Sequence, residues 1–421
     1  MSPTFRALRN PNYRLYLAGS VVSNTGTWMM RVAQDWLVLK PLDGGGQAVG
    51  IVTGLQFLPV LLLTPLAGVI ADRYPKRTLL QFTQALMGFF SIASAVAAIS
   101  GHSSLWFVYL CAFGLGVGAA FDAPARQSFV SEMVDRDDLT NAVGLNSASF
   151  NVARLVGPAL AGVLIAIWGS GQEATGWVFA LNGVSYLAVI IQLRRMDQSL
   201  LHTPRPRVLG RGALGDAVRY VGSQPKMVFV LILVFFAGTF GMNFQITSAL
   251  MATEVFGKGA GEYGLLGSTL AVGSLIGALM AARRVRIRLR LLAGAAIAFG
   301  VAEVVAGSLP TYWLFALFSP VIGFFTLTLL NSANGMLQLE ADPAMRGRVM
   351  ALYMTVVQGG TPLGAPIIGW LGAEYGPRWT LWGGGLLTGL GALLAIVLYA
   401  RAQGRTGAGL RQVLTPSPQR R

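Results

Sequence analysis

At residues 68–77 the chain reads Gly-Val-Ile-Ala-Asp-Arg-Tyr-Pro-Lys-Arg, a charged turn between the apolar runs 51–71 and 78–100. Each run has about the 20 residues that an α-helix needs to cross the hydrocarbon core of a bilayer. Four charged side chains within six residues are too costly to place inside that core. The stretch therefore predicts two membrane helices joined by a short basic loop.

The same pattern repeats along all 421 residues, of which 54% are apolar and only 12% charged. Soluble domains are about a quarter charged, so these values exclude a soluble enzyme and indicate a polytopic membrane protein. The first run carries Arg31 and Asp35 and is expected to stay in the membrane as a helix rather than be cleaved as a signal peptide. The apolar runs predict about 12 helices, at 15–39, 51–71, 78–100, 105–121, 141–168, 177–193, 226–252, 262–282, 291–308, 313–335, 348–371 and 379–400.

The net charge of +15 is distributed unevenly between the two sides of this predicted topology. If the N-terminus is cytoplasmic, 27 of the 32 Lys and Arg residues fall in cytoplasmic segments and three fall outside. This asymmetry follows the positive-inside rule and places both termini in the cytoplasm. We therefore attribute the basic charge to topology and to contact with anionic lipid headgroups, and expect no nucleic-acid partner.

Six predicted helices, a polar stretch and six more helices divide the chain into two halves. The expected divisions are a cytoplasmic N-terminal segment at 1–14, a six-helix bundle at 15–193, a cytoplasmic linker at 194–225, a second six-helix bundle at 226–400 and a disordered cytoplasmic tail at 401–421. The halves show a weak repeat, in which Gly157 and Gly162 fall on Gly364 and Gly369 at an offset of 207. Two such halves are typical of secondary transporters, which rock one half against the other.

The loop at 68–77 resembles the signature of the major facilitator superfamily in Gly68, Asp72, Arg73, Lys76 and Arg77. It departs from that signature at positions 74–75, which are Tyr-Pro here and include a glycine in many members. The chain also resembles the enterobactin-exporter-like branch of drug:proton antiporters at residues 5–16, 24–29 and 124–127. The resemblance implies an all-α fold of 12 transmembrane helices in two pseudo-symmetric bundles.

The resemblance also implies that Gly68, Asp72, Arg73, Arg77 and Asp122 form a cytoplasmic gate. Asp72 can face a helix N-terminus, and Arg73 and Arg77 are expected to pair with Asp122 while the cytoplasmic side is closed. The alternative is that the basic cluster only anchors the topology. In the second half Ala281 replaces the aspartate, so that Arg283 and Arg284 are expected to meet Glu340 or Asp342 instead.

The helix predicted at 141–168 contains Gly157, Pro158 and Gly162. Small residues four or five apart let membrane helices approach closely, and the proline loosens the backbone. The segment resembles, imperfectly, the Gly-Pro motif of exporters in the superfamily. That resemblance favours export, and plain helix packing is the alternative.

Charged residues inside the predicted membrane helices are candidates for proton coupling, because a charge in the bilayer is costly unless it is paired with an opposite charge or faces water. Asn24, Trp28, Arg31 and Asp35 share one face of the first helix. Arg154 is a second cation that could reach Asp35. We predict that Asp35 binds a proton in the outward state and releases it inward; a permanent Arg31–Asp35 structural pair is the alternative.

Other polar and aromatic side chains extend this interpretation. Glu303, near the outer end of its helix, is expected to snorkel to the interface.

The walls of the predicted substrate cavity are apolar with a few amides, which suits a lipophilic or amphipathic ligand. The predicted lining comprises Asn24, Trp28, Asn243, Phe244, Gln245, Phe318, Phe325 and Asn331.

The sequence thus predicts a monomeric bacterial inner-membrane exporter of small lipophilic or amphipathic molecules, which moves them by alternating access. Protons and membrane lipids are the expected partners, and a proton gradient the expected drive. A dedicated siderophore or natural-product exporter and a lysolipid or glycolipid flippase are the alternatives. One cysteine and two histidines leave few ligands for a metal site, so neither a metal, a cofactor nor a membrane enzyme is expected.

Overall fold

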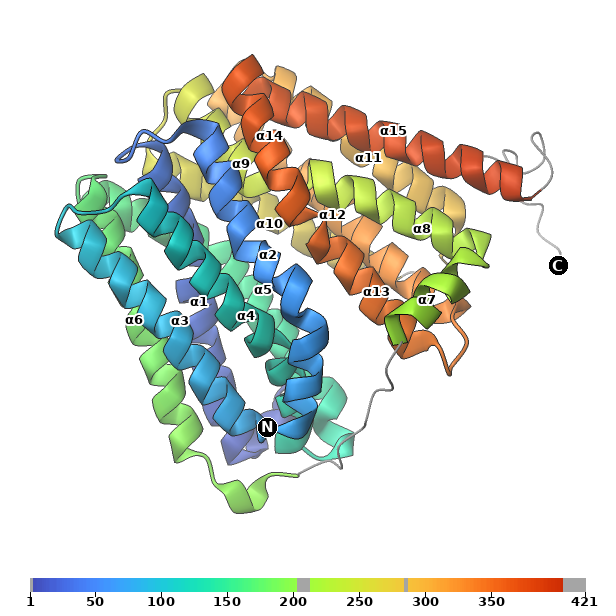
Figure 1. Ribbon diagram of the computed structural model, residues 1–421, viewed down its shortest axis with the longest axis horizontal. Helices are drawn as coiled ribbons and strands as arrows, with labels where there is room; N and C mark the ends of the chain where they lie inside the picture. The colour runs from blue at the N-terminus through green and yellow to red at the C-terminus, as the bar shows by residue number, and fades with distance from the viewer. Residues whose placement is uncertain (1–2, 203–212, 284–286, 404–421) are drawn as a thin grey trace. The chain divides into compact units, whose positions relative to one another are not determined.

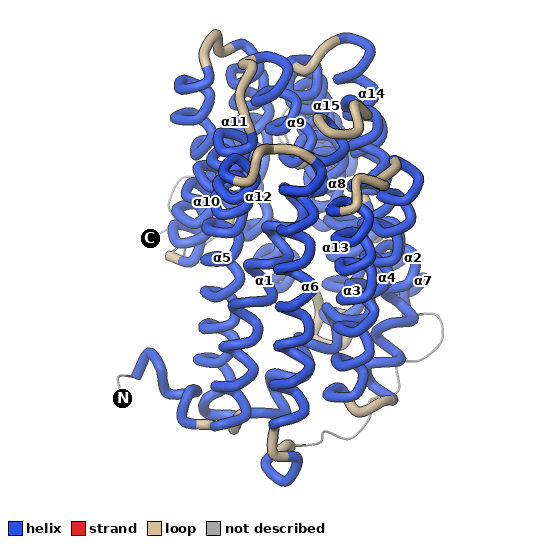
Figure 2. Tube along the Cα trace, turned by 90° about the vertical axis from the view of Figure 1, so that its left-hand side faces the viewer, coloured by secondary structure: helices blue, strands red, loops and turns tan. Residues whose placement is uncertain are grey.

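Every regular element in the described part of the chain is a helix (Figures 1 and 2). The computed structural model describes residues 3–202, 213–283 and 287–403, without the side chains of residues 3, 4, 65, 72, 213, 214 and 282. The predicted tail at 401–421 lies almost entirely outside these residues. The elements are η1 Pro3–Arg9, α1 Pro11–Leu39, α2 Gly45–Arg73, α3 Lys76–Ile99, α4 Leu105–Met133, α5 Arg136–Ile167, α6 Gln172–Arg195, η2 Gln198–Leu200, α7 Ala213–Gly222, α8 Pro225–Phe236, η3 Ala237–Gly241, α9 Phe244–Leu250, η4 Met251–Val255, α10 Ala260–Ala282, α11 Leu289–Ser308, α12 Tyr312–Glu340, α13 Arg346–Gly359, α14 Thr361–Tyr375 and α15 Arg378–Ala402.

Ten helical segments of the described residues are long and apolar enough to cross a membrane. The two remaining predicted spans, 15–39 and 348–371, are also helical: they correspond to α1 and to the successive helices α13 and α14. With 29 residues, α1 is about 43 Å long and exceeds a hydrocarbon core of about 30 Å. The all-helical membrane architecture expected from the sequence is therefore present.

Several helices are longer than their apolar runs predict. The helix expected to end at residue 121 continues as α4 to Met133, past Pro124, and the one expected from residue 141 begins as α5 at Arg136. Likewise α12 continues to Glu340 rather than to 335. Hydropathy marks only the part of a helix that lies in hydrocarbon, whereas backbone hydrogen bonding continues into the polar residues beyond it.

The span expected as one helix at 226–252 is broken. It consists of α8, the π-helix η3, two residues outside helical geometry, α9 and the π-helix η4. At the break, the side-chain amide of Asn243 donates to the backbone oxygens of Thr239 at 2.8 Å and Phe240 at 3.2 Å. An Asn side chain that bonds nearby carbonyls offers the backbone an alternative to the helix, which explains the interruption.

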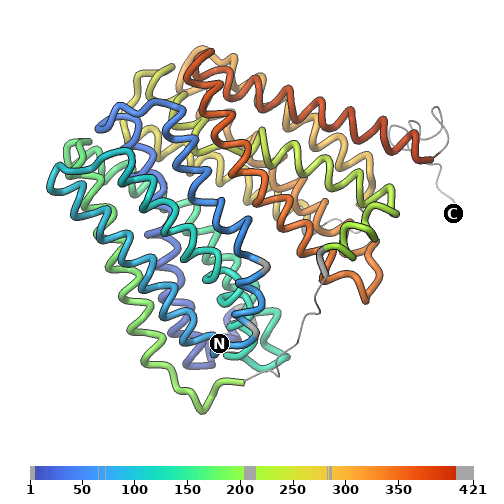
Figure 3. Tube along the Cα trace, viewed as in Figure 1, coloured from blue at the N-terminus to red at the C-terminus, as the bar shows by residue number. Residues whose placement is uncertain are grey.

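The chain forms two compact units, which differ from the predicted halves in one segment. Unit 1 comprises Met1–Leu209 and Ala252–Ser268, and unit 2 comprises Gly210–Met251 and Thr269–Arg421. In unit 1, α3 packs along α6, α2 along α4, and α1 along α5. In unit 2, α11 packs along α15 and α12, while α8 packs along α15 (Figure 3 colours these segments by residue number). The first third of α10 thus belongs to the unit that contains the first six helices.

The two units repeat the same glycine contacts. A Cβ atom on Gly157 of α5 would lie 3.1 Å from the backbone oxygen of Thr25 of α1, and one on Gly364 of α14 would overlap the backbone oxygen of Thr239 in η3. Each glycine therefore lets two helix backbones touch, as small residues do in membrane bundles. Gly157 and Gly364 are 207 residues apart, as the sequence repeat predicts, but Thr25 and Thr239 are 214 apart. The repeat thus contains an insertion that a single offset does not capture.

Candidate functional site

The guanidinium of Arg31 on α1 is held by two aromatic rings. Its Cζ atom lies 4.9 Å from the ring centre of Trp28 and 5.3 Å from that of Phe57 on α2. Trp28 in turn packs edge-on against Phe150 of α5, with ring centres 6.0 Å apart. A cation over an aromatic face is stabilised by about 0.5–2 kcal/mol, depending on its exposure to water. The cation thus lies against rings from α1 and α2, and α5 supports one of those rings.

Asp35, one turn after Arg31, is 1% exposed and has a phenol rather than a cation as its hydrogen-bond donor. The hydroxyl of Tyr263 on α10 donates to Asp35 Oδ2 at 2.7 Å. The other oxygen, Oδ1, has no hydrogen-bond partner among the described residues. The described ion pairs include neither Arg31 nor Arg154. The predicted pairing of Asp35 with these cations is therefore not found in this structure.

A small cavity lies beside Arg31 inside unit 1. It has a volume of about 60 Å³, and its lining combines polar side chains, among them Thr27, Gln34 and Gln56, with apolar ones such as Met30 and Met87. Gln56 Nε2 donates to Gln34 Oε1 at 2.6 Å across α1 and α2. The space admits a few water molecules but not a drug-sized ligand, which needs several hundred Å³.

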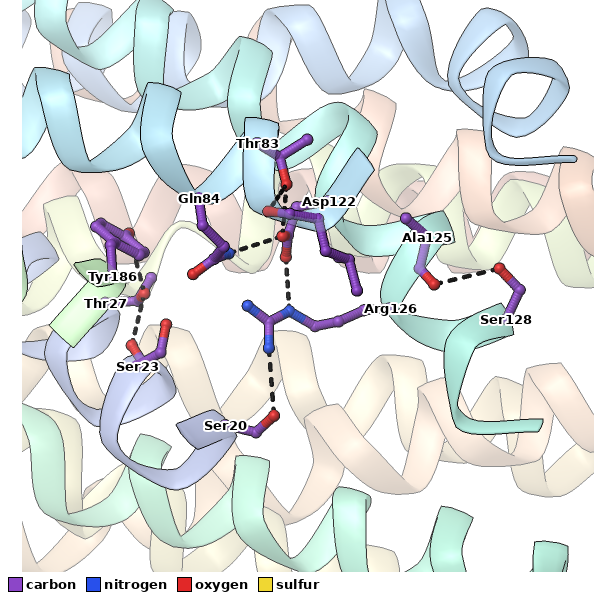
Figure 4. Close-up of polar contacts among 11 residues, drawn as sticks. Ser20, Ser23, Thr27, Thr83, Gln84, Asp122, Ala125, Arg126, Ser128 and Tyr186 are labelled. Carbon is purple, nitrogen blue, oxygen red and sulfur yellow. Dashed lines mark hydrogen bonds and ion pairs between the residues drawn. The ribbon is translucent and has the colours of Figure 1, made fainter. Parts of the chain in front are cut away.

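A second polar cluster surrounds Asp122 on α4 (Figure 4). Asp122 accepts hydrogen bonds from Arg126 Nε at 2.6 Å, from Gln84 Nε2 at 2.7 Å and from Thr83 Oγ1 at 3.0 Å. Arg126 also donates to Ser20 Oγ of α1 at 3.3 Å. In this structure Asp122 therefore pairs with Arg126 rather than with Arg73 or Arg77, the partners expected while the cytoplasmic side is closed. An arginine four residues away on the same helix takes that place, because residues i and i+4 meet on one helix face.

The basic residues of the 68–77 loop make different contacts inside unit 1. Lys76 Nζ forms a buried ion pair with Glu132 Oε1 of α4 at 2.7 Å. Arg77 donates to the last carbonyl oxygens of α6, at 2.6 Å and 2.9 Å. Arg73 is exposed, a Cβ atom on Gly68 would meet open space, and the side chain of Asp72 lies outside the described residues. The loop thus fastens α3 to α4 and α6.

The glycines of α5 bring two helices close to it. As described above, Gly157 contacts α1. A Cβ atom on Gly162 would overlap the backbone oxygen of Ala260, and one on Gly267 of α10 would lie 2.9 Å from Pro158 Cβ. The segment 157–162 therefore contacts both α1, which carries Asp35, and the part of α10 that carries Tyr263.

In unit 2 the acidic residues near 340 do not pair as predicted. Glu340 bonds Lys226 of α8 at 2.8 Å rather than Arg283, and the backbone N–H of Asp342 donates to the hydroxyl of Tyr220 on α7. Arg284 lies outside the described residues. Arg348 of α13 pairs with Asp216 of α7 at 3.0 Å. The short linker helix α7 is thus fastened to unit 2.

The predicted lining residues of unit 2 lie on two elements. Asn243 is buried, and its side-chain amide donates to the backbone oxygen of Thr239. Phe244 packs edge-on against Phe299 of α11, with ring centres 6.1 Å apart. The remaining residues, Gln245, Phe318 and Phe325, are half-buried, and Asn331 is exposed. In unit 1, Asn24 and Trp28 are half-buried. Their role in binding stays a prediction.

Sequence reasoning missed Tyr263 and misplaced Glu303. Tyr263 lies 228 residues from Asp35, and no spacing or motif connects the two positions. Glu303, expected to snorkel to the interface, is instead fully buried in unit 2. The only sequence signal for it was the presence of a carboxylate within an apolar run.

Comparison with known proteins identifies the family to which this chain is similar. The family model described as transmembrane secretion effector matches residues 2–407. The chain is 28% identical to the multidrug efflux pump Tap of Mycobacterium tuberculosis (strain H37Rv), over 86% of this chain and 87% of Tap. It is 25% identical to the enterobactin exporter EntS of Citrobacter koseri, over 80% of this chain and 76% of EntS.

A solved structure shows the same fold. A bacterial homologue of the human lysosomal transporter Spinster, in an inward-facing and occupied conformation, superposes with a TM-score of 0.71, over 93% of this chain and 97% of that chain. At 16% sequence identity this likeness concerns the fold alone. It agrees with the two-bundle architecture expected from the sequence.

Proposed function

Because this chain belongs to the transmembrane secretion effector family of the major facilitator superfamily, we propose that it exports lipophilic or amphipathic small molecules in exchange for protons. It is a multi-pass membrane transporter rather than an enzyme, as its relatives are. Its similarity to Tap, a multidrug efflux pump, supports the substrate class. The charge asymmetry of the sequence supports a bacterial inner membrane with both termini in the cytoplasm.

The observation that carries the coupling proposal is the buried contact between Asp35 and Tyr263. An ionised carboxylate inside a membrane bundle is costly unless a cation or several donors compensate it. Within the described part of the chain Asp35 has one hydrogen-bond donor, at 2.7 Å, and the neighbouring guanidinium of Arg31 lies against two aromatic rings. This arrangement suits a carboxyl group that carries a proton.

Loss of the proton has a ready compensation. Arg31 is one helical turn from Asp35, and residues i and i+4 on a helix can pair. A cation–π contact is worth about 0.5–2 kcal/mol, so a buried carboxylate can draw the guanidinium away from Trp28 and Phe57. We propose that Asp35 alternates between a protonated state bonded to Tyr263 and an ionised state paired with Arg31. The small cavity beside Arg31, whose lining includes Gln34 and Gln56, supports a route for water and protons.

In the proposed cycle the loop at 68–77, with the buried Lys76–Glu132 pair, keeps the cytoplasmic ends of α3 and α4 together as unit 1 moves. This assigns the loop a structural part in the gate. The segment 157–162 contacts both helices that form the Asp35 site, so motion of α5 can reach that site. The protein is proposed to act as a monomer surrounded by lipid, with no cofactor.

The test uses inside-out membrane vesicles with an acid interior and a fluorescent lipophilic cation. Wild-type protein is expected to accumulate the cation inside as long as the gradient lasts, and Asp35→Asn to lose this gradient-driven uptake. Tyr263→Phe is expected to shift the pH dependence of uptake, because it removes the donor to Asp35. Asp43→Asn is the matched control, since Asp43 is an exposed carboxylate eight residues further on.

Full gradient-driven uptake by Asp35→Asn would reject Asp35 as the coupling acid and leave export standing. The similarity to an enterobactin exporter favours one second candidate, a siderophore exporter. Wild-type vesicles that ignore the lipophilic cation but take up a catecholate siderophore would replace the main proposal by that candidate.

A further inference from the structure

Glu303 of α11 is a buried carboxyl group that the proposed transport cycle does not use. Its side chain is 0% exposed, and neither Oε1 nor Oε2 has a hydrogen-bond partner among the described residues. Buried carboxylates normally have partners, because desolvation penalises the ionised form heavily. An acidic residue in this position calls for a functional explanation.

Close packing of helices holds the side chain in place. A Cβ atom on Gly300 of α11 would lie 2.6 Å from the backbone oxygen of Gly385 of α15, and one on Gly385 would lie 2.5 Å from that of Gly300. The backbones of α11 and α15 therefore touch at Gly300, one helical turn before Glu303 in the chain. Glycines let membrane helices approach this closely, and at this distance no water layer separates α11 from α15.

The carboxyl group faces the break in the span that contains α8 and α9. A Cβ atom on Gly241, the last residue of η3, would lie 3.0 Å from Glu303 Oε2 and 2.9 Å from Thr388 Oγ1. One on Gly384 would lie 3.4 Å from Oε2 and 2.7 Å from the backbone oxygen of Phe240. The carboxyl group therefore lies beside Gly241 and Gly384, with the π-helix η3 on one side.

Charged groups on the packed helices are engaged elsewhere. Lys226 of α8 pairs with Glu340 of α12 at 2.8 Å. Arg378, at the start of α15, donates to the backbone oxygens of Gly307 and Leu309 at the end of α11. Arg290 and Arg401 lie at the far ends of α11 and α15. Within the described residues, no ion pair includes Glu303.

We propose that Glu303 is a second proton-binding site, separate from Asp35, that holds a proton against the broken helix and releases it when that helix moves. The described residues supply no hydrogen-bond donor to either carboxyl oxygen, and the Thr388 hydroxyl is already used as a donor to the backbone oxygen of Gly384, so the ionised form is penalised at this site. Interrupted helices that line ion sites are a recurrent device of secondary transporters, and π-helical turns occur frequently at functional sites. The proposal needs only that the protein is a transporter, not that Asp35 couples export.

A hydrophobic carbodiimide tests the proposal without any transport assay. Dicyclohexylcarbodiimide adds to a protonated carboxylic acid in an apolar site: the acid proton moves to one nitrogen, the oxygen attaches to the central carbon, and acyl transfer to nitrogen gives a stable acylurea. Purified protein in nanodiscs is labelled between pH 5 and pH 9, and the site is mapped by peptide mass spectrometry. Labelling of Glu303 is expected at acid pH, with a rate that falls at least tenfold as the pH rises.

Glu132 is the internal control, because it is also buried, at 5% exposed, but forms an ion pair with Lys76 and is expected to remain unlabelled. Labelling of Glu303 that does not change with pH would overturn the proposal, since the site would never release its proton. Equal labelling of Glu303 and Glu132 would also overturn it.

A variant covers the case in which the reagent cannot reach the site. Glu303→Gln reproduces the shape of the protonated acid and is expected to keep the wild-type melting temperature at pH 6. If Glu303 binds a proton more firmly in the folded protein than in the unfolded chain, wild-type stability falls as the pH rises, and Glu303→Gln removes that part of the decline. Identical pH profiles for the two proteins, together with no labelling, would overturn the proposal.

Discussion

Two Lys–Glu pairs of nearly equal length allow the effect of burial on an ion pair to be measured within one protein. The Lys76–Glu132 contact is 2.7 Å, with side-chain exposures of 10% and 7%. The Lys226–Glu340 contact is 2.8 Å, with exposures of 48% and 36%. Distance therefore hardly differs between the two pairs, and exposure differs several-fold.

We predict that Lys76→Met destabilises the protein by about 3–5 kcal/mol, because it leaves the Glu132 carboxylate buried without a counter-charge. Lys226→Met is expected to cost about 0–1 kcal/mol, since water solvates the exposed Glu340 carboxylate. The double variant Lys76→Met/Glu132→Met is expected to recover most of the loss. Well-packed apolar residues often replace a buried ion pair without a net cost.

The assay is thermal unfolding in one detergent, followed by intrinsic fluorescence, for the wild type, the two single variants and the double variant. For a cooperative unit of 150–250 residues, 1 kcal/mol corresponds to about 2–4 °C, so Lys76→Met should lower the melting temperature by at least about 6 °C. Equal effects of Lys76→Met and Lys226→Met would refute the reasoning. So would a Lys76→Met/Glu132→Met variant that is no more stable than Lys76→Met.

Two further predictions concern the packing of each unit. Gly364→Ala places a methyl group on the backbone oxygen of Thr239 and should lower the free energy of unfolding by about 1–3 kcal/mol or more. Gly389→Ala on α15, where a Cβ atom meets open space, should raise it by about 0.5–1 kcal/mol. Thermal unfolding should therefore show melting temperatures that shift in opposite directions, and equal losses would contradict the prediction. Arg77→Met removes two charge-assisted hydrogen bonds to the end of α6 and should cost about 1.5–3 kcal/mol. Faster amide exchange in the last turn of α6 would accompany that loss, and unchanged exchange there would speak against the cap.

Helix positions were predictable because hydropathy is a local property. Each predicted span from 15–39 to 379–400 is matched by helical structure, and a short helix, α7, lies in the predicted linker. The ends of α4, α5 and α12 were underestimated, since a helix continues where hydropathy no longer marks it. The break at Asn243 was missed because an apolar run gives no sign of which backbone bonds a side-chain amide will take.

The sequence could predict which residues belong to the candidate site but not which partners they contact. The sequence identified Asp35 and Arg31 as costly charges within a membrane helix, and it placed both on one face. It could not supply Tyr263, because that contact depends on how α10 packs against α1. The same limit explains Asp122, for which the sequence offered several cations and the fold selected Arg126.

The sequence by itself determined that the chain is a helical membrane protein with two related sets of helices, because the cost of placing each side chain in hydrocarbon adds up along the chain. Only the tertiary structure decided which buried carboxyl group has a hydrogen-bond donor or a cation beside it. The packing of the helices, including close glycine contacts, gave Glu132 its lysine and left both carboxyl oxygens of Glu303 without a hydrogen-bond partner among the described residues. These outcomes depend on segments far apart in the chain, and local hydropathy carries no information about them.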